Sequence, residues 1–291
     1  MNRYLIFRTD RIGDFHLTAI LVNAIKKNDT SAQVSIVASK KNFDYIKNFK
    51  LIDEVFLLKN NILDRFVLIN LLRKKKFKNI IVHDDKKRSH FITLFLKHEK
   101  KIIIKDKNVS HIGRIRNILN ELNFKFFNTS LDTLEDKKGS LKLNDFIQLH
   151  FDEKWIHSSY IKSYIKIEPK EQELLDFLKS LLSKTKRKIV ITTGINAPSI
   201  LKNVITKINN DNILYYENLD FSELENVVIN TKTLISCHGA ISHVATAKSI
   251  KQIDIIDKSY TYNIWNEHFR NYNYLYRKKF SELANDILKL L

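Results

Sequence analysis

Residues 4–25 read YLIFRTDRIGDFHLTAILVNAI, and the hydrophobic pattern changes twice within this segment. Residues 4–7 form a short apolar run of the kind found in strands, and residues 8–13 form a polar loop. Apolar side chains then recur at helical spacing, at Leu17, Ile20, Leu21, Ala24 and Ile25. Because this spacing places them on one face of a helix, the segment predicts a strand, a loop and a helix in succession.

The same alternation continues along the chain. Short apolar or β-branched runs lie at 34–37, 55–58, 80–82 and 102–104, and helical patterns lie at 62–72 and 112–122. The pattern weakens between residues 123 and 167. It resumes after Pro169, with strand-like runs at 189–192, 213–216, 234–236 and 253–256 separated by helical stretches, the last at 280–291. This alternation predicts an α/β chain of two tandem halves, each a parallel sheet covered on both faces.

The chain has 291 residues and is 44% hydrophobic, enough for two domains of ordinary size. Its apolar runs are too short to span a bilayer. Charged residues, among them Arg8 and Asp10, interrupt the first apolar run, so it does not predict a signal peptide. Cys237 is the only cysteine, so no intrachain disulfide can form. These features predict a cytoplasmic protein.

The formal net charge of +18 has two interpretations. A cationic surface attracts polyanions, either nucleic acid or the anionic inner face of the cytoplasmic membrane, where the protein would be peripheral. A chain rich in Lys, Ile and Asn is also what an AT-rich genome produces at neutral surface positions. Because the basic residues are spread along the chain, nucleic-acid binding receives little support.

Glycine is scarce, with five residues in the chain, and three of them mark loops that follow predicted strands. Gly13, Gly194 and Gly239 lie in loops 8–14, 192–199 and 236–240. Glycine is needed where φ is positive or where another group approaches the backbone closely. Since ligands of open parallel sheets bind at the carboxyl ends of strands, these loops are the candidate binding loops.

Several of these segments resemble glycosyltransferase family 9, the ADP-heptose:lipopolysaccharide heptosyltransferases and their relatives. The loop and helix RTDRIGDFHLTAILVNAIK at 8–26 are similar to the family's opening motif, with its Gly-Asp pair. LDFSEL at 219–224 and LISCHGAISHVATA at 234–247 are similar to its donor-site segment. A weaker match is HIGRIRNILNEL at 111–122. The matches occur in the family's order and are spread over most of the chain.

The resemblance implies a GT-B architecture, in which two Rossmann-like domains with parallel sheets face a cleft. Residues 1–160 would bind the acceptor, and residues 161–291 would bind the nucleotide sugar. The implied reaction is an inverting transfer of heptose or another sugar to lipopolysaccharide or another surface glycan. It needs no metal and no cofactor. The partners would be a nucleotide-sugar donor and an anionic glycan or glycolipid acceptor.

In the first domain the resemblance makes Asp14 the general base, which takes the proton of the acceptor hydroxyl. Position alone favours a helix N-cap for Asp14, and the two roles are compatible. Arg8, Arg11 and Gly13 belong to the same loop and are assigned to the acceptor or to the loop itself.

In the second domain a pyrophosphate needs backbone N–H groups and a helix N-terminus. Gly239 and Ala240, which precede a helix, offer them. His238 lies in the same turn, and the family places a histidine near the phosphates at His243. The loop residues Thr192, Thr193 and Gly194 offer hydroxyls and an exposed turn, although ordinary packing at a strand end explains the threonines equally well. Cys237 has no activating base at fixed spacing and is interpreted as a small half-buried residue rather than a nucleophile.

Two departures from the family leave the donor nucleotide and the sugar open. Cys237-His238 stands where the family has an acidic residue. The loop after the second domain's first strand normally carries a lysine, but loop 194–199 has none, and the nearest is Lys202. The alternative is a non-catalytic Rossmann-like protein that binds a nucleotide or a polyanion. The acidic pair after His83 is interpreted as a solvated strand end rather than a metal site.

Overall fold

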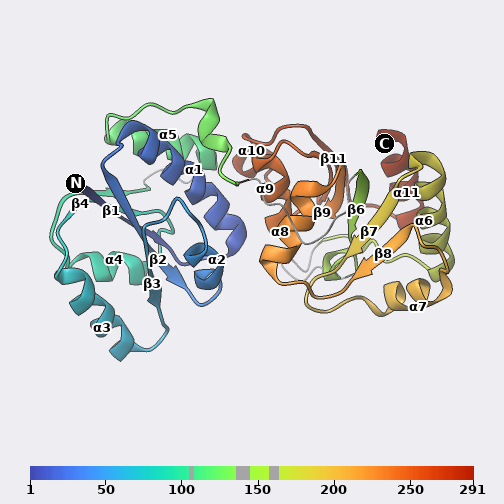
Figure 1. Ribbon diagram of the computed structural model, residues 1–291, viewed down its shortest axis with the longest axis horizontal. Coiled ribbons are helices and arrows are strands. Elements are labelled where there is room, and N and C mark those ends of the chain that lie inside the picture. Colours follow the sequence, from blue (N-terminus) through green and yellow to red (C-terminus); the bar gives the residue numbers. More distant parts are fainter. Residues whose placement is uncertain (105–107, 136–144, 157–163) are drawn as a thin grey trace. The chain divides into compact units, whose positions relative to one another are not determined.

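The structure is a computed structural model that describes residues 1–104, 108–135, 145–156 and 164–291. The chain divides into two compact units, each with its own sheet (Figure 1). The first unit comprises Met1–Thr133 and Tyr262–His268, and the second comprises Leu134–Thr261 and Phe269–Leu291. No helix within the described residues is long and apolar enough to cross a membrane.

The first unit contains a five-stranded parallel sheet in the order β3-β2-β1-β4-β5. Its strands are β1 (Asn2–Arg8), β2 (Ala32–Ser39), β3 (Glu54–Leu58), β4 (Phe77–Val82) and β5 (His98–Ile103). β1 is central and is buried along most of its length, from Tyr4 to Arg8. The chain therefore begins in the middle of the sheet and builds outward on both sides.

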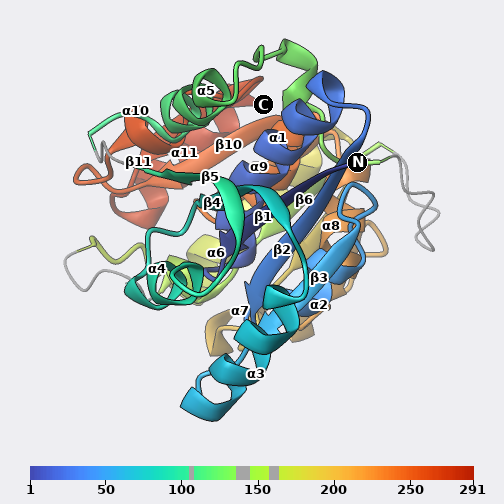
Figure 2. The same cartoon turned by 90° about the vertical axis from the view of Figure 1, so that its left-hand side faces the viewer.

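Helices cover both faces of this sheet. They are α1 (Ile12–Asn28), α2 (Phe43–Lys47), α3 (Ile62–Arg73), α4 (Lys87–Thr93) and α5 (His111–Glu121). α1 packs against α5. Side chains of α3 and of the α4 region share one buried cluster with Leu5, Phe7 and Ile80 of the sheet, so these two helices cover the same face (Figure 2). The short helix α10 (Tyr262–Trp265) belongs to this unit.

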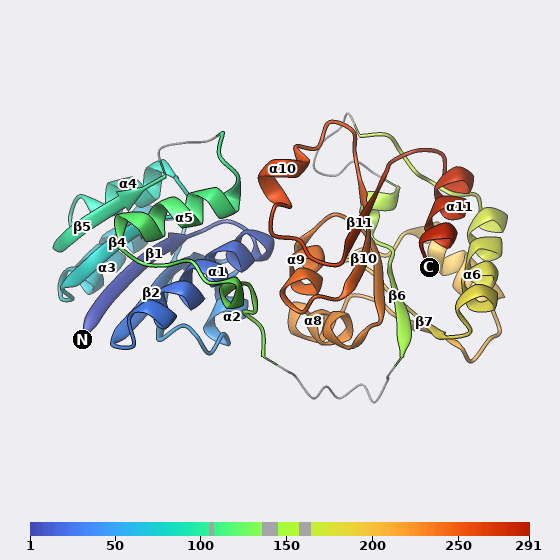
Figure 3. The same ribbon diagram turned by 90° about the horizontal axis from the view of Figure 1, so that it is seen from above.

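The second unit contains a six-stranded parallel sheet in the order β11-β10-β9-β6-β7-β8 (Figure 3). Its strands are β6 (Phe146–His150), β7 (Lys188–Thr192), β8 (Ile213–Tyr216), β9 (Thr233–Cys237), β10 (Lys251–Ile256) and β11 (Tyr272–Tyr276). Counted along the chain within this unit, the first and fourth strands are neighbours at the centre, which is the Rossmann order.

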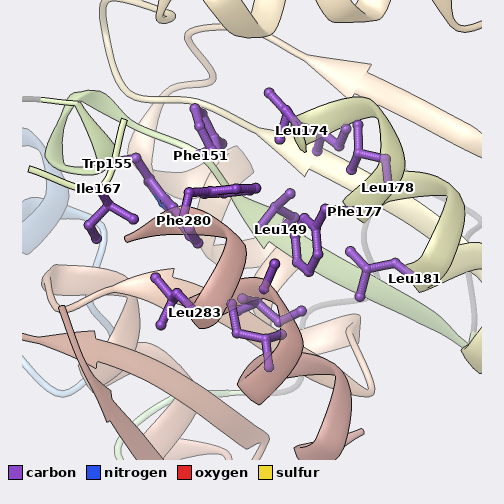
Figure 4. Close-up of a cluster of buried hydrophobic side chains, with 14 of the residues drawn as sticks. Leu149, Phe151, Trp155, Ile167, Leu174, Phe177, Leu178, Leu181, Phe280 and Leu283 are labelled. Carbon is purple, nitrogen blue, oxygen red and sulfur yellow. The ribbon is translucent and has the colours of Figure 1, made fainter. Parts of the chain in front are cut away.

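The helices of the second unit are α6 (Glu171–Thr185), α7 (Ser199–Lys207), α8 (Phe221–Asn230), α9 (Ala240–Ala247) and α11 (Phe280–Leu290). α6 and α11 pack together over a buried hydrophobic cluster, where Trp155 stacks on Phe151 at 4.9 Å between ring centroids (Figure 4). Phe280 and Phe177 meet edge to face in the same cluster. This core fixes the segment that follows β6.

The division of the chain falls earlier than the expected boundary after residue 160. β6 lies in the region of weak pattern, yet it is a central strand of the second sheet. Its polar residues Gln148 and His150 obscure the apolar run, although both side chains are buried and bond the Thr192 hydroxyl. Residues 262–268 also return to the first unit.

Candidate functional site

The strand orders place one switch point in each sheet, between β1 and β4 and between β6 and β9. At a switch point the two following loops diverge, so the carboxyl ends of the strands leave room for a ligand. The candidate site of the second unit is therefore formed by the segment after β6 and the turn from β9 into α9. That of the first unit is formed by the loops after β1 and β4.

The segment after β6 is held tightly along its backbone. Phe151 N donates to Thr192 O at 2.8 Å, and Trp155 Nε1 donates to His150 O at 2.8 Å. Arg277 Nη2 donates to Lys154 O at 2.6 Å. Because these three hydrogen bonds hold the segment in place, the Lys154 side chain extends from a rigid backbone.

The Lys154 ammonium lies at the switch point itself. Nζ is 3.0 Å from Asp152 Oδ2, and it donates to the carbonyl oxygens of His238 at 3.1 Å and Cys237 at 3.4 Å. The Lys154 side chain is only 15% exposed. A cation is thus fixed beside the turn that opens α9, where the first helical N–H groups lie.

Asp152 holds this cation in place. Its carboxylate is buried, and Lys154 N also donates to its Oδ1 at 3.1 Å. Burial alone would raise the pKa of the carboxyl, but the charge of Lys154 and the contact with His150 lower it to about 2. Asp152 is therefore ionised at neutral pH, and the two charges form a buried pair.

Close approach, rather than backbone conformation, accounts for Gly194 and Gly239 in the second unit. No described glycine has a positive φ. A Cβ atom at Gly239 would lie 2.5 Å from Lys154 Nζ, and one at Gly194 would lie 2.7 Å from Glu153 Oε2. Both glycines thus leave room for side chains of the segment after β6.

His238 is part of a polar network behind the start of α9. Its Nδ1 lies 2.6 Å from Asp254 Oδ2, and its Nε2 lies 2.7 Å from Tyr260 Oη. Ser242 Oγ donates to the other carboxylate oxygen of Asp254 at 3.1 Å and accepts from Gly239 N at 3.2 Å. Burial and the nearby Asp254 charge raise the pKa of Tyr260. The network fixes the turn, and the His238 side chain is 16% exposed.

The remaining predicted donor residues are placed differently. His243 is buried in α9, where its ring meets Phe269 edge to face at 5.1 Å. The Thr192 hydroxyl is buried and shared between Gln148 and His150. The Thr193 hydroxyl donates to Gly194 O and accepts from the backbone of the loop after β8. Both threonine hydroxyls are therefore engaged within the protein.

Cys237 is fully buried at the end of β9, whereas a half-buried residue was expected. Burial raises the pKa of its thiol, with the charge of Asp152 adding to the effect. A thiol held in its protonated form is a poor nucleophile.

In the first unit, Asp14 occupies the third position of α1 rather than its N-cap. The N-cap is Arg11, and the Asp14 carboxylate accepts a hydrogen bond from Arg11 N at 3.2 Å. Asp14 is partly exposed, as is Gly13. The carboxylate thus helps to cap the helix and still faces solvent at the carboxyl edge of the sheet.

Arg8 is a buried guanidinium in the same loop. Its Nε donates to Thr18 Oγ1 at 2.7 Å, and its Nη1 lies 3.2 Å from Asp10 Oδ2. Asp10 also pairs with Lys86. Arg8 therefore joins β1 to α1, whereas the other arginine predicted in this loop, Arg11, is exposed.

The loop after β4 completes the edge of the first sheet. Asp84 Oδ2 accepts from Thr9 Oγ1 at 2.5 Å and from Ser89 Oγ at 2.9 Å, so this carboxylate fixes both loops. Arg88 Nη2 also donates to Thr9 Oγ1, at 2.8 Å. Asp85 pairs with His90 at 3.0 Å. The two carboxylates therefore bond to neighbouring side chains of the first unit and hold the loops after β1 and β4 together.

The second unit thus brings together His238, Gly239 and Ala240 with a residue that sequence reasoning missed, Lys154. The lysine is expected in the loop after the unit's first strand. The apolar pattern predicts β7 as that strand, because the polar residues of β6 interrupt its apolar run. The loop after the first strand does carry a lysine, and its signal was the Asp152-Glu-Lys154 run directly after an apolar segment. Lys202 instead pairs with the exposed Glu217.

No family profile and no curated protein matches the sequence. The structure, in contrast, is similar to solved structures over nearly its whole length. The heptosyltransferase WaaC of E. coli, solved with ADP, is 13% identical with a TM-score of 0.76, and the match covers 99% of this chain and 98% of WaaC. A glycosyl transferase family 9 protein from Veillonella parvula is 13% identical with a TM-score of 0.74, covering 99% and 91%.

A UDP-GlcNAc 2-epimerase from Methanocaldococcus jannaschii shares the fold less closely, at 12% identity and a TM-score of 0.61, covering 99% of this chain and 92% of the epimerase. The expected α/β fold class of two parallel-sheet, Rossmann-like domains of GT-B type is therefore confirmed. At such identities the likeness concerns the fold, and the chemistry has to be argued from the residues of this chain.

Proposed function

We propose that this protein is a glycosyltransferase that uses a nucleoside-diphosphate sugar as its donor. The observation that carries the proposal is the Lys154 ammonium, fixed by Asp152 beside Gly239 at the N-terminus of α9. A diphosphate binds where backbone N–H groups, a helix N-terminus and a cation converge. In the second unit they converge at the switch point of the sheet, where nucleotides bind in this topology.

The structural neighbours support this reading. WaaC was solved with ADP, and it shares the fold across both units. Together with the sequence motifs at 8–26 and 234–247, this favours sugar transfer by a family 9-like enzyme over mere nucleotide binding. The acceptor in our proposal is lipopolysaccharide or another surface glycan, and the sugar is heptose or a related one.

The proposed reaction is a single displacement that inverts the anomeric carbon. Asp14 takes the proton of the acceptor hydroxyl as its oxygen forms a bond to the anomeric carbon. The bond from that carbon to the diphosphate oxygen breaks, and the electron pair leaves on the diphosphate. Lys154 and the N–H groups of α9 stabilise the negative charge that develops there. In this scheme the cationic lysine takes the part that a metal takes elsewhere, so we propose no metal and no cofactor.

The acceptor in our proposal is anionic and binds at the carboxyl edge of the first sheet. Arg11 is exposed there, and the Lys86 and Arg88 side chains lie beside the same loop. Arg8 is buried and Gly13 lies in the first turn of α1, so neither residue adds an exposed charge to this surface. An acidic sugar or phosphate on the acceptor would meet this basic edge.

The donor is identified by thermal unfolding of the protein with ADP, GDP, UDP or CDP. A diphosphate at about 100 times its Kd adds roughly 2.7 kcal/mol to the free energy of unfolding. We expect one diphosphate to stabilise the protein well above the others. If none does, the donor site is not functional and the fold alone is shared. If UDP stabilises and UDP-GlcNAc is epimerised rather than transferred, the epimerase neighbours are the better guide.

The base is tested separately with Asp14→Asn. The variant should transfer sugar about 10²- to 10⁴-fold more slowly, because the proton of the attacking hydroxyl has no acceptor. Its Kd for the stabilising diphosphate should be unchanged. Because an amide oxygen still accepts the hydrogen bond from Arg11 N, the helix cap and the melting temperature should be preserved. Normal turnover by this variant would exclude Asp14 as the base.

A further inference from the structure

Helix α3 exposes large apolar side chains to solvent along one side. Leu63 is 72% exposed and Val67 is 67% exposed, and Ile62, Phe66 and Leu71 are also exposed. The opposite side of α3, with Leu68, Ile69 and Leu72, is buried against the sheet. A helix that is apolar on both sides buries both of them in its working environment.

The α4 region extends this apolar surface. Leu94 is 73% exposed, and Phe91 and Phe95, whose rings meet edge to face at 5.1 Å, are exposed as well. α3 and α4 cover the same face of the first sheet, and both lie toward the viewer in Figure 2. Among the described residues, eight of the fourteen exposed large apolar side chains lie on α3 or at α4. We call these eight residues the apolar face.

Basic side chains border the apolar face. Exposed cations follow the end of α3 and lie on the adjoining elements, at Arg73, Lys74, Lys76, Lys78 and Lys87. The nearby carboxylates are already paired. Glu54 pairs with Lys75 at 2.9 Å, and Asp64 pairs with Lys59 at 3.5 Å. The border therefore carries a surplus of positive charge.

We infer that the apolar face is a docking surface for an anionic lipid bilayer. A helix that combines bulky apolar side chains with Lys and Arg lies in the plane of the membrane interface, its apolar side among the acyl chains. The cations then meet acidic headgroups. With 12 residues, α3 is about 18 Å long, which suits lying on a membrane rather than spanning it.

The charge decides between a bilayer and a second copy of the chain. In a self-association the cationic borders of two molecules, each with a formal charge of +18, would be brought together and would repel. A nucleic acid would complement the cations but would leave the aliphatic side chains of Ile62, Leu63 and Val67 without an apolar partner. Of these three partners, only an anionic bilayer offers acyl chains to the apolar face and acidic headgroups to the cations around it.

The inference is tested by co-sedimentation of the full chain with vesicles. Phosphatidylcholine vesicles containing about a quarter phosphatidylglycerol should bind the protein, and pure phosphatidylcholine should bind it far more weakly. The triple variant Leu63→Ser, Val67→Ser, Leu94→Ser should lose at least about tenfold in partitioning. Because these side chains are mostly exposed, the melting temperature should not fall.

A second triple variant, Arg73→Gln, Lys74→Gln, Lys76→Gln, should lose about a hundredfold on the anionic vesicles, and its binding should depend less on salt. The matched control is Lys179→Gln, Lys184→Gln, Lys188→Gln, which removes the same charge from exposed positions in the second unit and should bind nearly as well as the wild type.

Vesicle binding that neither triple variant at α3 and α4 reduces would overturn the inference. So would an absence of vesicle binding, particularly if the protein dimerises and the apolar triple variant is monomeric, because a second copy would then occupy the face. The inference does not rest on the proposed transferase activity. Stabilisation by a diphosphate is measured without lipid, so the two ideas fail independently.

Discussion

At the scale of single residues, the proposed donor site depends on the buried pair of Lys154 and Asp152. Removing only the cation leaves a buried carboxylate uncompensated, which costs about 3–5 kcal/mol of stability. With Lys154→Gln alone, a loss of diphosphate affinity could therefore not be separated from a loss of stability. The double variant Lys154→Gln, Asp152→Asn removes both charges and should recover most of the lost stability.

We predict that the double variant binds the stabilising diphosphate at least about tenfold more weakly than the wild type, because the charge-assisted contact is lost. Isothermal titration measures the affinity, and thermal unfolding measures the stability. Lys202→Gln is the matched control, since Lys202 pairs with Glu217 at the surface, 50% exposed, and should leave the affinity unchanged. Equal affinities in the wild type and the double variant would remove Lys154 from the site.

Two buried histidines of the first unit should make the stability depend on pH. Burial and the nearby charge of Arg114 lower the pKa of His111 to about 3, and burial and the charge of Arg8 lower the pKa of His83 well below its usual value. Both are neutral in the folded state and take up protons readily once unfolded. Their contribution is thus complete above about pH 6.5 and is lost as the pH falls from there toward 3.

The expected result is a decline in the free energy of unfolding that begins near pH 6.5, before carboxylates titrate. His111→Gln should flatten the curve between pH 6.5 and 4 in urea unfolding experiments. His98→Gln, at an exposed position on β5, serves as the control and should keep the slope. An identical slope in the wild type and in His111→Gln would contradict the lowering of the His111 pKa by burial and by Arg114.

At the scale of elements, the sequence predicted the strands that contain an apolar run and missed two, β6 and β11, in which polar or aromatic residues interrupt the run. β1, β7 and β10 were found from their runs of Ile, Leu and Val. β6 was missed because Gln148 and His150 look like loop residues until Thr192, on another strand, satisfies them. β11 was missed because its tyrosines alternate with Asn273 and Leu275, so it shows period-two alternation and no apolar run.

The missed strand is also why the candidate site was predicted only in part. The turn at Gly239 follows a recognisable strand and opens a recognisable helix, so local pattern was enough to predict His238, Gly239 and Ala240 as donor-binding residues, and this role stays a prediction. Lys154 contacts that turn through the carbonyl oxygen of Cys237, although the two residues are 83 positions apart in the sequence. A contact of that range depends on strand order, which local periodicity does not reveal.

The start of α9 provides a test of this contact. In Gly239→Ala the new methyl group would lie 2.5 Å from Lys154 Nζ, so the ammonium has to move away from the turn. We predict about a tenfold loss of diphosphate affinity with little change in melting temperature, because the end of a lysine side chain moves easily. In Gly113→Ala the methyl group would instead meet Val109 in the first unit, and the affinity should stay unchanged.

At the scale of the whole molecule, the two units repeat one design. In each sheet the first strand of the unit lies beside the fourth, and a glycine lies at the start of a helix that follows a central strand, Gly13 in the first turn of α1 and Gly239 at the N-cap of α9. The tandem α/β organisation was predicted, since it follows from periodicity repeated along the chain. The boundary was not, because the return of residues 262–268 to the first unit leaves no local mark on the sequence.

The most direct test of the donor site is amide hydrogen exchange across the entire chain, with and without the diphosphate that stabilises it most. We predict that the amides protected from exchange on diphosphate binding are centred on residues 151–155 and 238–243. In the Lys154→Gln, Asp152→Asn variant this protection should be lost. Protection confined to the loops of the first unit, or unchanged in that variant, would contradict the assignment of the donor site to Lys154 and α9.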